Sequence, residues 1–139
     1  PKTNGVFANE HYQTKLPWLF SCGNVLHVHD LVDNVALEGK QVGLFASLYA
    51  QKKLYNGNLI KVSHSSDFAY VLPYTLFEGT EDVEMKFRLK NKIVRKWIVV
   101  KSDGKEIAKK FVLAGVPGEM MTMKFNKSGI KNEVTMEVQ

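Results

Sequence analysis

The chain has 139 residues, 45% of them hydrophobic and 24% charged, which is the composition of a globular protein able to bury one core. The net charge of +5 comes from 19 Lys and Arg scattered among 14 Asp and Glu, so no basic block predicts a nucleic-acid interface. A single cysteine excludes an internal disulfide and fits a reducing cytoplasm, and no apolar run approaches the ~20 residues of a membrane span.

The first element expected along the chain is a short buried strand over 16–22. The polar run 1–15 before it should be extended. Pro17 suits the beginning of a strand, because proline cannot donate to a central ladder. The apolar run ends at Gly23-Asn24, where a glycine allows the backbone to approach a ligand closely.

The second element expected is an amphipathic helix that begins near Asp30 or Leu31 and ends near Leu54. Asp30 is the candidate N-cap. Apolar residues recur at three- and four-residue spacings: Leu31, Val32, Val35, Ala36, Val42, Ala46 and Tyr49. Gly39 and Gly43 disfavour a helix by ~1 kcal/mol each relative to alanine, so we expect them to allow close packing against a sheet.

After residue 56 the hydrophobic period changes from helical to alternating, which predicts a boundary between domains 1–56 and 57–139. Seven segments of the second domain have the pattern of short strands: 59–62, 68–73, 83–89, 94–101, 106–113, 120–125 and 134–138. Asp103-Gly104 supplies the positive φ angles of a tight hairpin turn. The expected fold is α+β and mainly β, with an immunoglobulin-like antiparallel sandwich after a strand–loop–helix unit.

The segment around Gly23-Asn24 carries a motif of the form T-x-x-P-x-hydrophobic-F-x-x-G-D, followed by a helix with small residues on its packing face. The matching positions are Thr14, Pro17, Leu19, Phe20, Gly23 and Asn24, then Ala36, Gly39 and Gly43. This pattern resembles the last FAD-contacting segment of the pyridine nucleotide-disulfide oxidoreductases. The run CGNVLHVHDLVD is similar to C-G-N-x-x-H-V-H-D-L-V-D of a subgroup of NAD(FAD)-dependent dehydrogenases with glycerol-3-phosphate-dehydrogenase-like partners.

The resemblance implies that the chain is the C-terminal part of an FAD-dependent oxidoreductase linked to NAD(P), in which hydride passes from nicotinamide to flavin. Residues 1–56 would be a remnant of the FAD/NAD(P)-binding domain, and the cofactor contacts would come from Gly23, Asn24, Asp30, Leu31 and Val32. The sandwich would be an accessory or partner-docking domain. Because the chain has no G-x-G-x-x-G, we expect it by itself to be inactive and to bind no FAD. No catalytic residue is assigned.

Asn24 stands where the family usually has an aspartate that accepts a hydrogen bond from a flavin ribityl hydroxyl. An amide oxygen can accept the same bond without a charge. The alternative is an ordinary turn asparagine after a glycine, and we favour the flavin role because Thr14, Pro17 and the helix are in register with it.

His27 and His29 form an H-x-H sequence that could suggest a metal site with Asp30. Zinc usually takes three or four protein ligands, and the C-x-x-C and H-x-x-x-H spacings are absent, so we assign no metal. The histidines are expected instead to shape the loop beside the flavin. A lone Cys22 is expected to be a small buried hydrophobe and not a redox centre.

Two further expectations concern surfaces. If the motif resemblance is accidental, the chain is an independent β-sandwich module for binding or protein interaction. If the helix belongs to a larger FAD domain, most of the sheet that would cover its apolar face is absent from this chain. We therefore expect self-association through Leu31, Val35, Val42, Ala46 and Tyr49.

Overall fold

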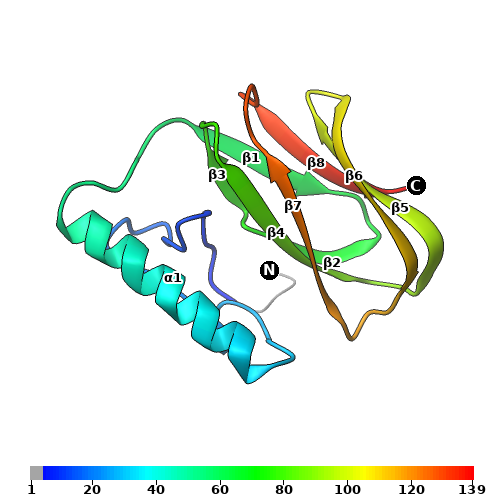
Figure 1. Cartoon of the computed structure of the whole chain (residues 1–139), viewed down its shortest axis with the longest axis horizontal. Helices are drawn as coiled ribbons and strands as arrows, with labels where there is room; N and C mark the ends of the chain where they lie inside the picture. The colour runs from blue at the N-terminus through cyan, green and yellow to red at the C-terminus, as the bar shows by residue number, and fades with distance from the viewer. Residues whose placement is uncertain (1–4) are drawn as a thin grey trace.

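A computed structural model describes residues 5–139 (Figure 1). A 3-10 turn, η1 (Gly23–Val25), precedes the helix α1 (Val32–Ala50). The strands follow: β1 (Leu59–His64), β2 (Phe68–Leu72), β3 (Thr75–Phe77), β4 (Asp82–Leu89), β5 (Ile93–Ser102), β6 (Lys105–Gly115), β7 (Met120–Asn126) and β8 (Glu133–Val138). The expected α+β, mainly β class is confirmed.

The strands form two sheets, one of five strands in the order β3-β1-β8-β5-β6 and one of three in the order β2-β4-β7 (Figure 1). Pairing is antiparallel except between β1 and β8, which run parallel from Lys61↔Glu133 to His64↔Met136. The inward residues of both sheets meet in one core, so the two sheets form a two-layer β-sandwich. In β4 the inward side chains alternate strictly with outward polar ones, as a half-buried strand requires: Val83, Met85, Phe87 and Leu89.

The seven predicted strands are confirmed, with ends that differ by one or two residues. The hairpin turn between β5 and β6 is confirmed too, since Asp103 and Gly104 have φ values of 47° and 80°. Sequence patterns missed β3, because a strand of three residues is too short to show an alternation.

The strand expected over 16–22 is not formed. The run forms a single isolated β-bridge, Gln13↔Phe20. Its Leu16 and Trp18 side chains are 47% and 63% exposed. The strand signal was apolar content, but a strand also needs a neighbour to accept its backbone hydrogen bonds, and no strand of residues 5–139 lies alongside. The polar run expected to be extended over 1–15 is described from residue 5, where it is irregular, with a turn at residues 10–11 and isolated bridges at Asn9 and Gln13.

The helix is shorter than expected, and its N-cap differs from the expected one. It ends at Ala50 and not near Leu54, because Lys52 adopts a left-handed conformation with φ 56°. Leu31 occupies the N-cap position and makes no side-chain capping bond. Asp30 therefore does not cap α1; its carboxylate binds Arg88 of β4 instead.

Within residues 5–139 nothing packs closely on Gly39 or Gly43, so their role in packing against a sheet stays a prediction. Both are exposed, and a Cβ added at either position would have no atom within 4 Å. The buried residues of α1 are Glu38 and Val42, which directly precede the two glycines and lie about 100° away from them around the helix.

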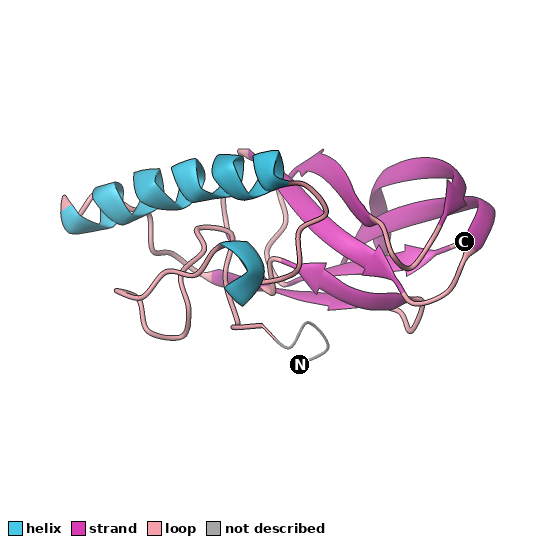
Figure 2. Cartoon of the chain, turned by 90° about the horizontal axis from the view of Figure 1, so that it is seen from below, coloured by secondary structure: helices cyan, strands magenta, loops and turns pink. Residues whose placement is uncertain are grey.

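The segment before α1 lies between the helix and the three-stranded sheet (Figures 1 and 2). A small second core joins Ala8 and Leu26 of this segment to Tyr70 and Leu72 of β2. Three ion pairs cross the same contact, each with its acid before residue 57 and its base in the sandwich: Asp30–Arg88, Glu10–Lys127 and Glu38–Lys86. Charge complementarity therefore fixes this segment against the sandwich.

Candidate functional site

The Glu38 side chain is the centre of the most connected polar cluster among residues 5–139. Its carboxylate is 0% exposed, although it belongs to a 19-residue surface helix. Oε1 accepts hydrogen bonds from the Gly23 backbone N–H at 2.7 Å and from His29 Nε2 at 3.0 Å. Oε2 accepts one from Lys86 Nζ at 2.6 Å and lies 3.4 Å from His27 Nε2. Every lone-pair direction of this carboxylate is thereby occupied.

Three separate elements bring these groups together. The loop between η1 and α1 carries both histidines, whose rings contact each other with centroids 4.3 Å apart and planes tilted by 46°. Glu38 is in the second turn of α1, and Lys86 points outward from β4, with its ammonium also donating to the Tyr12 hydroxyl at 3.2 Å. The cluster therefore lies at the contact between the motif segment and the sandwich.

The carboxylate is ionised. Burial by itself raises the pKa of Glu38, but hydrogen bonds from His27 and Lys86, the charge of Lys86 and the Gly23 N–H outweigh it and hold that pKa well below its ordinary value. Burial opposes the charge of Lys86 as well, yet Tyr12 and Glu38 raise the pKa of its ammonium. The pair is thus a buried Glu⁻–Lys⁺ bridge.

His27 is neutral at this site. Burial lowers its pKa, and the hydrogen bond to Glu38 only partly offsets that effect. A neutral ring that donates from Nε2 to the carboxylate must accept at Nδ1, where the Tyr70 hydroxyl lies at 3.2 Å. Tyr70 in turn accepts a hydrogen bond from Arg88 Nε at 3.1 Å.

Arg88 carries the network to the beginning of α1. Its guanidinium binds the Asp30 carboxylate and donates to the Val28 carbonyl at 3.1 Å. The other Asp30 oxygen accepts the Met120 N–H at 2.8 Å. The hydrogen bonds from Arg88 and Met120 lower the pKa of Asp30, so this acid is also ionised.

Within residues 5–139, His27, His29 and Glu38 are the group of metal-type ligands, with one ligand atom from each within 4.8 Å of the others. Two imidazoles and a carboxylate are a donor set that zinc accepts. However, the Lys86 ammonium already lies 2.6 Å from the carboxylate and supplies the positive charge that a metal ion would bring. A buried divalent ion beside that ammonium would be repelled, so the geometry favours a hydrogen-bonded cluster and not a metal centre.

The five predicted cofactor residues lie within the segment 23–32, but they differ in how accessible they are to a ligand. Gly23 is buried, and its N–H donates to Glu38 Oε1. Asn24 is exposed, with Oδ1 accepting the His29 N–H at 3.3 Å. Asp30 is held by Arg88, while Leu31 and Val32 are 64% and 82% exposed.

The histidines hold the loop, as expected, while their place beside a flavin stays a prediction. Both side chains are almost fully buried and point toward Glu38, away from the exposed corner at Asn24. Their contacts with Glu38 hold the loop on its buried side, so neither ring is exposed to a ligand at the surface of the loop. Sequence reasoning missed Glu38, although an acid three residues after Val35 and four before Val42 on an apolar helix face was a usable signal.

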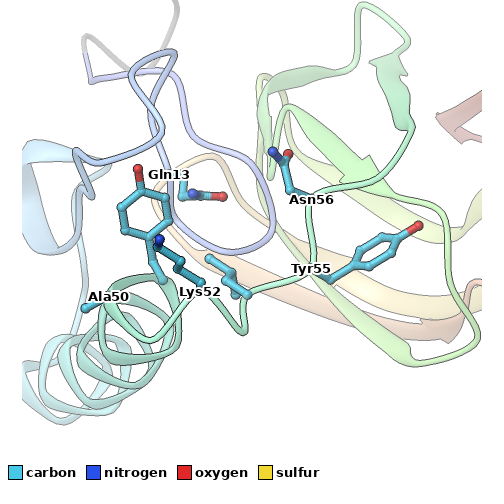
Figure 3. A pocket seen from close by; sticks show the side chains of 7 residues that line it. Gln13, Ala50, Lys52, Tyr55 and Asn56 are labelled. Carbon is cyan, nitrogen blue, oxygen red and sulfur yellow. The ribbon is translucent and has the colours of Figure 1, made fainter.

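A second open groove lies elsewhere, at the C-terminal end of α1 (Figure 3), and it is no larger than the groove of about 440 Å³ whose lining includes Glu38 and Lys86. Its volume is about 440 Å³, and its lining includes Gln13, Tyr49, Lys52, Leu54, Tyr55 and Asn56. None of these is a buried titratable side chain, and the lining includes neither Glu38 nor its partners. It is the less suitable of the two sites for chemistry.

Comparison with protein families, with curated proteins and with solved structures gives no match for this chain. Among residues 5–139, no helix has the length and apolar character required to cross a bilayer.

Proposed function

We propose that this chain is the C-terminal part of an FAD-dependent, NAD(P)-linked oxidoreductase, in which the Gly23–Asn24 corner and the first turn of α1 contact the flavin. One observation carries the proposal: a group of large apolar side chains is exposed within the motif segment. Its members are 43% to 82% exposed: Trp18, Leu19, Val25, Val28, Leu31 and Val32.

Exposure on this scale favours a missing neighbour. Scattered apolar residues on a surface are ordinary, but a contiguous group above a few hundred Å² marks an interaction site. The sandwich core of the same chain is well closed, with Phe68, Phe87 and Met136 fully buried. The exposed group also coincides with the run that resembles the FAD-contacting motif. We therefore infer that an FAD-binding domain covers these side chains.

The local geometry of the corner is compatible with a ligand. Gly23 has φ 65°, a conformation that favours glycine, and the following Asn24 is exposed and polar. An asparagine there can offer its amide to a ribityl hydroxyl. In this proposal the segment 16–22 becomes a strand once the sheet of the FAD domain is beside it, and residues 1–56 are the remnant of that domain.

Two finer parts belong to the same proposal. The sandwich is of immunoglobulin-like type, and a glycerol-3-phosphate-dehydrogenase-like subunit is the partner that the motif subgroup implies. Cytoplasmic localisation follows from the reducing environment that a single free thiol suits.

The test is the visible absorption spectrum of the purified product of the complete gene, beside that of the 139-residue chain. We expect an oxidised-flavin spectrum from the former and no FAD binding by the latter in calorimetry, because the pyrophosphate and adenine contacts need the Gly-rich fingerprint. Asn24→Leu in the complete product should weaken FAD binding by about 1 to 3 kcal/mol. A complete product without flavin contradicts the proposal.

An independent binding module is the second candidate, and one observation favours it. Val94, Trp97, Phe111 and Leu113 are 41% to 66% exposed on β5 and β6. Trp97 and Phe111 are cross-strand partners with ring centroids 5.1 Å apart, and Lys109 Nζ lies 5.4 Å from the Trp97 ring. Such aromatic groups are frequent at protein interfaces. Absence of flavin from the complete gene product would favour this function.

A further inference from the structure

We propose that Lys86 and Glu38 set the conformation of the Gly23–Asn24 corner, which makes the sandwich an integral part of the flavin site and not an accessory domain. The flavin half of this inference rests on the function proposed above. The conformational half concerns the chain alone. Both residues are positioning residues, since neither contacts a cofactor in the argument.

The first step is the contact between the carboxylate and the corner. The Gly23 N–H donates to Glu38 Oε1 at 2.7 Å, and the Gly23 carbonyl accepts from Leu26 N at 2.9 Å and His27 N at 3.2 Å. Both backbone groups of Gly23 are thereby engaged. A charged acceptor forms a stronger hydrogen bond than a neutral one, so Glu38 is the strongest single restraint on this peptide.

A second path runs from the same carboxylate to the corner. His29 Nε2 donates to Glu38 Oε1 at 3.0 Å, and the His29 backbone N–H donates to Asn24 Oδ1 at 3.3 Å. The orientation of the Asn24 amide therefore depends on the loop that Glu38 fixes. One carboxylate restrains both residues of the corner.

The second step is the dependence of Glu38 on the sandwich. A carboxylate that is 0% exposed needs a paired charge, and Lys86 Nζ at 2.6 Å is its cation. Without this ammonium the carboxylate would have to take up a proton or move toward water. Either event removes the charged acceptor from the Gly23 N–H.

The same strand holds the other end of the loop. Lys86 and Arg88 are two residues apart in β4, so their side chains lie on one face of the sheet. Arg88 binds Asp30 and the Val28 carbonyl, immediately before α1. Two basic side chains of β4 therefore hold the loop 23–30: Lys86 through Glu38, and Arg88 through Asp30 and the Val28 carbonyl.

The conformational half is tested by NMR on the 139-residue chain, with the Gly23 and Asn24 amides as probes. In Lys86→Met we expect the Gly23 amide resonance to move and its hydrogen exchange to accelerate about 10-fold or more. Lys86→Arg should restore most of the protection. Lys124→Met is the matched control, because Lys124 pairs with Glu84 at 3.7 Å while 71% exposed, and it should leave both amides unchanged.

A folded Lys86→Met chain whose Gly23 amide keeps its shift and exchange rate overturns the proposal. If Lys86→Met does not fold, Glu38→Gln takes its place, because it keeps the shape of the acceptor and removes its charge; the same two outcomes then decide.

The flavin half is tested by FAD titration of the complete gene product. Lys86→Met should weaken FAD binding about 10-fold, with rescue by Lys86→Arg and no effect of Lys124→Met. An unchanged FAD affinity, with a displaced Gly23 amide, overturns the claim that the sandwich is part of the site. If the wild-type product holds no flavin, the proposed function fails by itself, and the amide experiment still decides the conformational half.

Discussion

Lys86 Nζ lies 2.6 Å from Glu38 Oε2, and this contact joins a strand of the sandwich to a helix residue 48 positions earlier in the chain. The acid is fully buried and the base is 14% exposed. Removing one partner of such a pair is more costly than the net strength of the pair, because the other charge is left buried.

Lys86→Met should therefore lower the free energy of unfolding by about 3 to 5 kcal/mol, as measured by urea denaturation at neutral pH. Lys124→Met, at an exposed pair, should change it by less than about 0.5 kcal/mol. In a double-mutant cycle, adding Glu38→Leu should recover part of the loss, since the unpaired charge is then gone. Strict additivity of the two substitutions would show that the residues are not coupled.

A second prediction concerns the loss of stability at acidic pH. His11 lies between the rings of Phe45 and Phe77, with centroids 4.7 and 4.9 Å away, and its Nδ1 is buried without a hydrogen-bond partner. Burial, and then the charge of Lys127, lower the pKa of His11 to about 4. The unfolded chain binds a proton below about pH 6.5, while the folded chain does not until about pH 4.

Stability should consequently fall as the pH drops from about 6.5 to about 4, and His27, whose pKa is also lowered, acts in the same direction. His11→Phe keeps an aromatic ring between its neighbours but cannot titrate. Between about pH 7 and about pH 5, we expect the free energy of unfolding of this variant to fall by roughly 1 kcal/mol less than that of the wild type. This figure is reduced for the partial exposure of His11. Urea denaturation at both pH values measures this, and equal losses for the two proteins would contradict it.

The helix glycines give a third prediction. Gly39 is exposed inside α1 and has free space around it, so Gly39→Ala should stabilise the chain by about 0.5 to 1 kcal/mol through helix propensity. Gly23→Ala should destabilise it by about 1 to 2 kcal/mol, because Gly23 has φ 65°. The space at Gly23 is adequate, with Val35 Cγ1 at 3.6 Å, so the cost is one of backbone conformation. Thermal unfolding of both variants checks the opposite signs.

Self-association through α1 is a fourth prediction, and the structure changes the residues that should carry it. Val42 is buried inside the chain, and Val35 is half-buried, so they are poor contacts for a second copy. Leu37 and Leu44 are 60% and 59% exposed on another face of the helix. We expect sedimentation velocity to detect dimers of the wild type that Leu37→Glu, Leu44→Glu abolishes.

A monomeric wild type at high concentration would contradict this expectation. So would equal dimerisation of the double variant. Lys105→Glu, which makes the same change of charge at an exposed position of β6 away from α1, is the charge-matched control.

The sequence by itself determined the elements whose pattern is local. Alternation identified β4, from Val83 to Leu89, because a strand with one buried face repeats every two residues. Asp103-Gly104 identified the β5–β6 turn, because few residues adopt positive φ. Three-residue and four-residue spacing identified α1, although it could not say which face would be covered.

Only the tertiary structure decided the cluster and the failed strand. Nothing local links Glu38 to Lys86, whose outward position in β4 has the pattern of a solvated side chain; the pairing exists because the loop before α1 packs on the sandwich. The run 16–22 is apolar enough for a strand, but among residues 5–139 it pairs only through the isolated bridge Gln13↔Phe20, and a strand needs a neighbouring strand along its length to satisfy its backbone groups. Hydrogen-bond partners and buried charges are supplied by distant residues, so they are properties of the fold.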